Sequence, residues 1–186
     1  MKPLYEYLIG GNKAGRSVKY QYHPVSWYEL HNLMYELVKQ RGMDGDYNDI
    51  DTSQVDDMNG LFAGPMFDDF NGDITKWNTS RVTNMENIFR CCHKFNRDLS
   101  DWDVSRVEEM KGMFYECTLF NQDLSHWDVT AVKHMDYMFK GTKKLKQDFS
   151  SWEDKFISLK SCSRMFEGSL MEGHMNWIPK FYSKDL

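Results

Sequence analysis

The chain has 186 residues and a formal net charge of −5, with 41% hydrophobic, 15% aromatic and 27% charged residues. This length and composition predict one folded domain with a sizeable core, and they exclude an intrinsically disordered chain. The negative charge argues against direct binding to nucleic acid, and no run of about 20 apolar residues predicts a membrane-spanning helix.

The first 46 residues predict a helical N-terminal cap. Ser26 precedes an amphipathic segment and Glu29 follows three positions later, which is the pattern of a capping box. The apolar residues of that segment recur at helical spacing, and Gly42 marks its end. Residues 10–15 are rich in glycine and predict a turn or loop. Because the N-terminus lacks the apolar run typical of a signal peptide, we expect a cytoplasmic protein.

Residues 47–169 repeat one motif with a period of 25 residues in the central copies. The motif reads F-N-x-D-L-S-x-W-D-V, as in Phe120–Val129. Tryptophans recur at this interval, at Trp77, Trp102, Trp127 and Trp152. A fixed period of this length is typical of a repeat array, in which each unit packs on its neighbours. We therefore expect the aromatic and aliphatic residues of the motif to fill a continuous core.

Each unit also contains the pattern V-x-x-M-x-x-[LIM]-F, as in Val107–Phe114. This spacing predicts a short helix, for which Ser105 and Glu108 form a capping box. The following L-x-x-W-x-V segment matches the strand of a leucine-rich repeat. The expected fold is an α/β repeat solenoid, a leucine-rich-repeat-like array of about five strand-plus-helix coils with a parallel sheet. Residues 170–186, including Trp177, predict a C-terminal cap, so that cap, repeats and N-terminal helix form a single structural domain.

The repeated residues resemble those of BspA-type leucine-rich-repeat surface proteins and of the related mycoplasma lipoprotein repeats. The resemblance rests on the pattern V-x-x-M-x-x-M-F-x-x-C-x-x-F-N-x-D-L-S-x-W-D-V and covers residues 47–169. It implies a surface-displayed protein that binds other proteins or host surfaces. The chain also resembles short leaderless repeat proteins encoded by phages and mobile elements, because we find no signal peptide, lipobox cysteine or wall anchor in it.

Four aspartates occupy one repeat position, at Asp73, Asp98, Asp123 and Asp148. A row of carboxylates suits a divalent cation, which makes a metal-dependent enzyme a weaker alternative function. We favour a structural role in which each aspartate, like the neighbouring Asn71, Asn96 and Asn121, accepts backbone N–H bonds in its own turn. The histidines are scattered over non-equivalent positions, and no nucleophile motif or phosphate-binding glycine loop is present. We therefore predict no enzyme activity, no cofactor and no metal site.

The cysteines predict reduced structural thiols. Cys92 and Cys117 occupy one repeat position, which Thr142 and Ser169 fill in later units. Exchange among cysteine, threonine and serine is the behaviour of a small core residue rather than of a disulfide partner.

The residues that the repeat leaves variable are the predicted partner-binding candidates. If each tryptophan faces the core, the residues beside it face outward, and most of these are acidic. A basic patch is expected late in the array. The candidates are Asp49, Asp51, Lys76, Asp101, Asp103, His126, Asp128 and Glu153 on the predicted sheet face, with Lys140, Lys143 and Lys144 in the basic patch.

These features predict a non-enzymatic, intracellular module that binds another protein. A sharper version is an inhibitor or adaptor whose acidic face occupies the basic groove of a nucleic-acid-processing protein. The same charges also fit an ordinary solubilising surface. The alternative class is an exported bacterial surface or adhesion protein whose targeting segment lies outside the present sequence. The sequence identifies neither the partner nor the oligomeric state.

Overall fold

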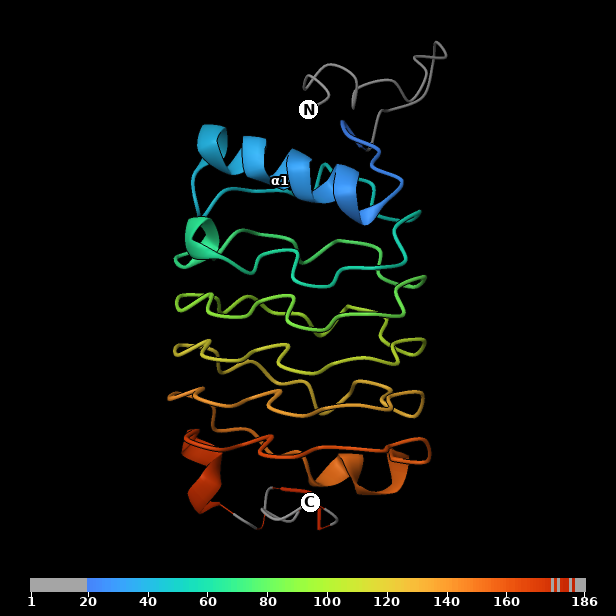
Figure 1. The fold of residues 1–186 in the computed structure, drawn as a ribbon, viewed down its shortest axis with the longest axis vertical. Helices are drawn as coiled ribbons and strands as arrows, with labels where there is room; N and C mark the ends of the chain where they lie inside the picture. Colours follow the sequence, from blue (N-terminus) through green and yellow to red (C-terminus); the bar gives the residue numbers. More distant parts are fainter. Residues whose placement is uncertain (1–19, 175, 177, 181, 183–186) are drawn as a thin grey trace.

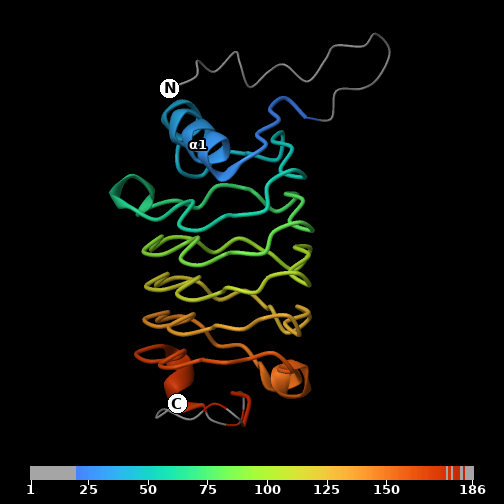
Figure 2. The ribbon, with the colours of Figure 1, turned by 45° about the vertical axis from the view of Figure 1, so that its right-hand side comes forward.

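A computed structural model describes residues 20–174, 176, 178–180 and 182. The chain winds into irregular coils stacked one on the next, with α1 (Trp27–Arg41) across one end (Figure 1; Figure 2). Three short 3₁₀ helices interrupt the coils: η2 (Pro65–Phe67), η3 (Ser150–Lys155) and η4 (Leu170–Gly173). The loop predicted at residues 10–15 and the closing role predicted for Trp177 lie outside the described residues.

The helix α1 forms where the sequence predicts it. The Ser26 hydroxyl accepts a hydrogen bond from the N–H of Glu29 at 3.3 Å, and the Glu29 carboxylate accepts one from the N–H of Val25 at 3.1 Å. Gly42 ends the helix with a φ of 80°. The helix lies against the first coil (Figure 1), and its buried residues belong to the same core: Leu30, Leu33, Met34, Leu37 and Val38. No helix of the described part has the length and apolarity needed to cross a membrane.

Equivalent side chains of successive coils stack in the core. The rings of Phe89, Phe114 and Phe139 form a column with neighbouring centroids 5.6 Å apart. The four repeat tryptophans (Trp77, Trp102, Trp127 and Trp152) are buried, and their indole N–H groups bond to the previous coil, as Trp127 does to the Leu99 carbonyl at 3.1 Å. The apolar residues of the repeat motif in Phe120–Val129 therefore fill the core as predicted: Phe120, Leu124, Trp127 and Val129.

The predicted α/β leucine-rich-repeat solenoid with a parallel sheet is wrong. Among the described residues, β-type pairing is confined to six isolated parallel bridges, and these do not extend into strands or a sheet. The predicted short helices are also wrong, because Val107–Phe114 and its equivalents are not helical and α1 is the one α-helix of the described part. The chain is therefore neither a leucine-rich repeat nor a solenoid of strands and helices.

Successive turns take the place of the predicted strand and helix. The N–H of Met113 donates to the Met110 carbonyl at 3.2 Å, and the N–H of Cys117 donates to the Phe114 carbonyl at 3.0 Å. Each such bond joins residues three apart, so both ends of a turn point inward while its central residues point outward. Alternate amides instead donate to the next coil, as Phe114 does to Met138 at 2.8 Å. An apolar spacing of three residues therefore reflects turns and not a helix face.

Left-handed backbone recurs at fixed positions of the coils and interrupts any regular element. One such column has φ between 53° and 59°, and its members are Gly60, Asn87, Gly112, Tyr137 and Arg164. A second column, four residues further on, has φ from 57° to 125°, and its members are Gly64, Cys91, Glu116, Gly141 and Gly168. Because left-handed residues do not fit a β-strand or a right-handed helix, the pairing between coils stays limited to isolated bridges.

Candidate functional site

The repeated aspartates hold the turns of the coils. In the column of Asp73, Asp98, Asp123 and Asp148, each carboxylate accepts the backbone N–H two residues later, at 2.8–3.1 Å. Hydrogen bonds from the Ser125 backbone and hydroxyl lower the pKa of Asp123. This confirms the structural interpretation of the column. No three His, Cys, Asp or Glu side chains of the described part are grouped so that they could hold a metal ion.

The repeated asparagines connect the coils, which differs from the prediction. The Asn96 side-chain oxygen accepts the N–H of Asn121 in the next coil at 2.9 Å, and Asn121 accepts the N–H of Lys146 at 2.8 Å. An asparagine offers both an acceptor and a donor, so it can close a bond to a neighbouring coil. The asparagines therefore do not close their own turns, as we expected from the sequence.

The residues beside the tryptophans face outward, but most are already engaged within the molecule. Asp103 and Asp128 form a second column of turns, in which each carboxylate accepts a backbone N–H at 3.1 Å and a hydroxyl at 2.7 Å. Hydrogen bonds from the hydroxyl and the N–H of Thr130 lower the pKa of Asp128. Lys76 pairs with Asp101 at 2.7 Å on the open surface. This face is therefore acidic, although few of its carboxylates are without a partner.

The two candidate aspartates of the first coil are held in place by neighbours. The Asp49 carboxylate accepts two bonds from the Arg41 guanidinium, at 2.7 and 2.8 Å. This hydrogen bond raises the pKa of Arg41. Asp51 accepts the N–H of Ser53 at 3.0 Å. Asp49 thus supports the junction between α1 and the coils, and Asp51 holds the turn of the first coil.

The remaining candidates do not gather into one cluster. Glu153 pairs with Lys180 at 3.2 Å, and His126 is exposed on its own coil. The ammonium groups of Lys140 and Lys143 reach Glu167 and the Gly168 carbonyl of the next coil, each at 2.8 Å. Lys144 is exposed beside them. The charge of the predicted basic patch is therefore partly neutralised by the last coil. The carboxylate that pairs with Lys140 is Glu167 and not one of the aspartates that flank the tryptophans.

A surface of which the sequence predicted only Lys140 lies on the segments that carry the parallel bridges. The Arg90 guanidinium lies 4.3 Å from the ring centroid of Tyr115, and the Lys140 ammonium lies 5.9 Å from the same centroid and 5.6 Å from that of Tyr137. Arg164 follows Tyr137 in the next coil. Arg90, Tyr115, Tyr137, Lys140 and Arg164 are called the cation–tyrosine patch below.

Two members of this patch stand in a strained backbone position. Tyr137 has a φ of 59° and Arg164 a φ of 53°, where other coils have Gly60, Asn87 and Gly112. A left-handed conformation costs a bulky residue about 1–2 kcal/mol relative to glycine. A comparison of each repeat column for glycine replaced by a large residue would have revealed this position in the sequence.

A serine, a histidine and acidic residues also meet on the bridging segments. His134 Nδ1 lies 2.8 Å from the Ser161 hydroxyl, and His134 Nε2 lies 3.9 Å from the Glu109 carboxylate. The Ser161 hydroxyl donates to Asp136, so the imidazole Nδ1–H is the donor to that same oxygen. A base that abstracts a serine proton must accept it, and His134 does not do so in this arrangement. The cluster is a chain of hydrogen bonds between coils.

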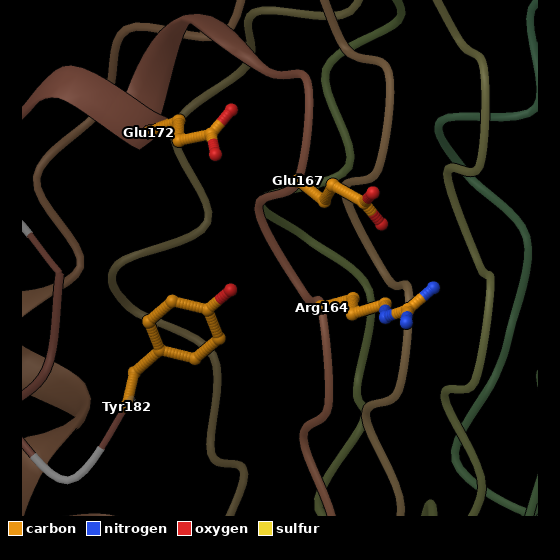
Figure 3. A pocket seen from close by; sticks show the side chains of 4 residues that line it. All are labelled: Arg164, Glu167, Glu172 and Tyr182. Carbon is orange, nitrogen blue, oxygen red and sulfur yellow. The ribbon is translucent and has the colours of Figure 1, made fainter. Parts of the chain in front are cut away.

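The last coil borders a pocket with a volume of about 250 Å³, lined by Arg164, Glu167, Glu172 and Tyr182 (Figure 3). The Glu172 carboxylate accepts the N–H of Gly168 at 3.0 Å. The hydrogen bond from Lys140 lowers the pKa of Glu167. Figure 3 shows Tyr182 and Glu172 on one side of this space and the backbone of the last coil on the other. The pocket therefore lies at the end of the stack.

One family model matches the chain, and its description is Mycoplasma protein of unknown function, DUF285. The match covers residues 31–152 and, in an overlapping second alignment, residues 65–175. No curated protein and no solved structure matches the chain. The comparisons thus agree with the mycoplasma-type repeat in the sequence and leave its role open.

Proposed function

The chain belongs to the Mycoplasma family of unknown function DUF285, and we propose that this member is a non-enzymatic module that binds another protein. A stack of coils with a constant interior offers an extended surface on which single columns vary. The cation–tyrosine patch is the part of that surface that we assign to the partner.

The observation that carries the proposal is the left-handed column. In three of its five positions the chain has Gly60, Asn87 and Gly112, and in the last two it has Tyr137 and Arg164. The backbone strain at these two residues is not offset by burial in the core, because Arg164 is exposed and Tyr137 is only half-buried. Tyrosine and arginine are enriched at protein interfaces, where they contribute large contact area and directed hydrogen bonds.

The acidic version of the proposal, in which the tryptophan-flanking face enters a basic groove, is less well supported. Asp103 and Asp128 hold turns, and Asp101 is paired with Lys76. Their charges still contribute to the long-range field that steers a basic partner. We therefore assign the acidic face to attraction at a distance and the cation–tyrosine patch to contact.

The finer resemblance to BspA-type surface proteins suggests where such a partner is found. Surface display would make the partner a host or extracellular protein, whereas a cytoplasmic protein would meet an intracellular one. We keep the cytoplasmic location as our proposal and the surface location as its alternative. Antibody labelling of intact and permeabilised cells decides between them, because labelling of intact cells contradicts the cytoplasmic location.

The proposal is tested by quantitative affinity capture from lysates of the cells that carry the gene. The bait is the full chain, the patch variant carries Tyr115→Ser, Tyr137→Gly and Arg164→Gly, and the matched control carries Asp103→Asn and Asp128→Asn. The control removes two charges but keeps an acceptor oxygen for each turn.

We expect a protein that the wild-type chain and the control retain and that the patch variant loses, with direct titration showing at least about tenfold weaker binding. Equal retention by the patch variant contradicts the assignment of the patch. A loss confined to the control moves the contact surface to the acidic face.

A further inference from the structure

The side chains of the cation–tyrosine patch form a ladder across four successive coils. Arg90, Tyr115, Lys140 and Glu167 occupy one repeat position. The Arg90 guanidinium lies 4.3 Å from the Tyr115 ring centroid, and the Lys140 ammonium lies 5.9 Å from the same centroid. Lys140 in turn pairs with the Glu167 carboxylate at 2.8 Å. Each side chain of the ladder thus contacts the equivalent side chain of the next coil.

The ladder already binds one carboxylate of the chain itself. The hydrogen bond from Lys140, its positive charge and that of Arg164 lower the pKa of Glu167. Figure 3 shows that the Glu167 carboxylate and the Arg164 guanidinium extend to the same side, away from Tyr182 and Glu172. The cations of the patch therefore suit a carboxylate ligand.

The two arginines of the patch have no carboxylate partner. Both side chains are exposed, and among the described residues neither Arg90 nor Arg164 takes part in an ion pair. A guanidinium that lies against a tyrosine ring loses less side-chain freedom when it then binds a carboxylate. Arg90 is therefore partly ordered for an acidic ligand by Tyr115.

Acidic side chains beside the patch are engaged elsewhere. Asp136 accepts the N–H of Ser163 at 2.8 Å. The Glu116 carboxylate packs over Gly141, where an added Cβ would lie 2.5 Å from it. An incoming carboxylate would thus meet arginines that no described side chain pairs with.

The separation of the two arginines sets the length of a ligand that reaches both. Arg90 and Arg164 are three coils apart, and coils spaced like paired strands, about 5 Å apart, would separate them by about 15 Å. In an extended peptide, residues four positions apart are about 13 Å apart and face the same side. The residue midway between them faces that side as well, toward Tyr115 and Tyr137. The length of the arginine side chains covers the remaining distance.

We propose that the cation–tyrosine patch binds an extended acidic segment of the partner protein, with carboxylates four residues apart on Arg90 and Arg164 and an aromatic residue midway on the tyrosines. A short segment is favoured over nucleic acid, because the net charge of −5 repels a long polyanion. The acidic face then attracts a basic remainder of the same partner. The inference rests on the proposed protein-binding function and adds to it the chemistry of the contact segment.

The experiment uses the full chain and fluorescein-labelled nonapeptides of serine and glycine. The probe peptide contains two glutamates four residues apart with a phenylalanine midway, and two control peptides replace both glutamates by glutamine or by lysine. Fluorescence anisotropy measures the Kd of each peptide at low and at high salt. We expect the glutamate peptide to bind at least about tenfold more tightly than either control, and its binding to weaken as salt is added.

Three variants sharpen the test. Arg90→Gln should weaken binding of the glutamate peptide about fivefold, whereas Arg106→Gln, which removes the same charge from an exposed arginine outside the patch, should change it less than about twofold. Glu167→Gln removes the carboxylate that occupies Lys140 and should strengthen binding about threefold. A merely structural role of Glu167 would not produce this gain.

Equal binding of the glutamate and glutamine peptides overturns the inference, as does the absence of binding by any peptide. A labelled single-stranded RNA of similar length that binds more tightly than the glutamate peptide also overturns it. The proposed function fails separately, when the Tyr115, Tyr137 and Arg164 variant retains the captured partner. Loss of capture by that variant without a preference for the glutamate peptide keeps the patch and removes the acidic segment.

Discussion

The central coils and the last coil share a motif but differ in what surrounds it. Between residues 82 and 141, coil stacks on coil, and the amides of one row find carbonyls in the next coil. In the last coil the same row borders the pocket beside Tyr182, and its Gly168 amide donates to the Glu172 side chain at 3.0 Å. The difference teaches that each unit of this repeat depends on the next one and that, at the end of the array, a side chain takes the place of a backbone acceptor.

A second contrast runs within the columns. The inward columns hardly vary, because rings stack at about the same separation from one coil to the next. The outward columns change, and the left-handed column changes from glycine to tyrosine and arginine. Stability is therefore a property of the repeated residues, and recognition is assigned to the residues that break the repeat.

The largest expected loss of stability separates a buried tryptophan of the core from an exposed leucine near the end of the stack. Trp127→Ala should lower the free energy of unfolding by about 3–5 kcal/mol, because it empties a buried site. Trp127→Phe keeps most of the volume but removes one of the two donors to the Leu99 carbonyl, which keeps the N–H of Trp102 at 3.0 Å, for a loss of about 1 kcal/mol.

The matched surface change is Leu170→Ala, which removes a side chain that is 43% exposed and should alter stability by about 0.5 kcal/mol or less. Denaturant unfolding measures all three variants. Similar small losses for Trp127→Ala and Leu170→Ala would contradict the inward assignment of the tryptophans.

The second largest expected change in stability concerns the left-handed column that contains Gly112 and Tyr137. Gly112→Ala should destabilise the fold by about 2 kcal/mol, because an L residue is strained at a φ of 59° and its Cβ would lie 2.4 Å from the Asn87 side-chain oxygen. Tyr137→Gly, at the equivalent position, should leave stability unchanged or raise it by about 1 kcal/mol or less. Thermal unfolding checks the pair, and a large loss for Tyr137→Gly would show that this tyrosine stabilises the fold.

The sequence was sufficient for the parts of the fold that depend on burial and on capping. The capping box of Ser26 and Glu29 and the stop at Gly42 are local signals, and α1 forms between them. The period of 25 residues predicts which side chains stack, and the structural interpretation of Asp73 and its equivalents follows from the strong tendency of aspartate to hold turns.

The secondary structure could not be derived in the same way, because one apolar spacing has two physical causes. Met110 and Met113 lie three residues apart whether the segment is a helix face or a turn that points both ends inward. Left-handed residues decide between the two, and they are hidden where Tyr137 or Glu116 replaces glycine.

The smallest expected effect concerns the turns that the central coils share. The folded-state pKa values of Asp123 and Asp128 are lowered by hydrogen bonds to their carboxylates, so these bonds stabilise the fold above the unfolded-state pKa of about 3.9. That contribution is lost as the pH falls through the lower, folded-state pKa values.

The double variant Asp123→Asn and Asp128→Asn keeps an acceptor oxygen but does not titrate, so its Tm should fall less between pH 5 and pH 2.5, by about 2 °C at most. Melting curves of both proteins at a series of pH values measure this difference. Because both aspartates are largely exposed, an effect much larger than this would mean that the turns of the central coils contribute more to stability than their burial suggests.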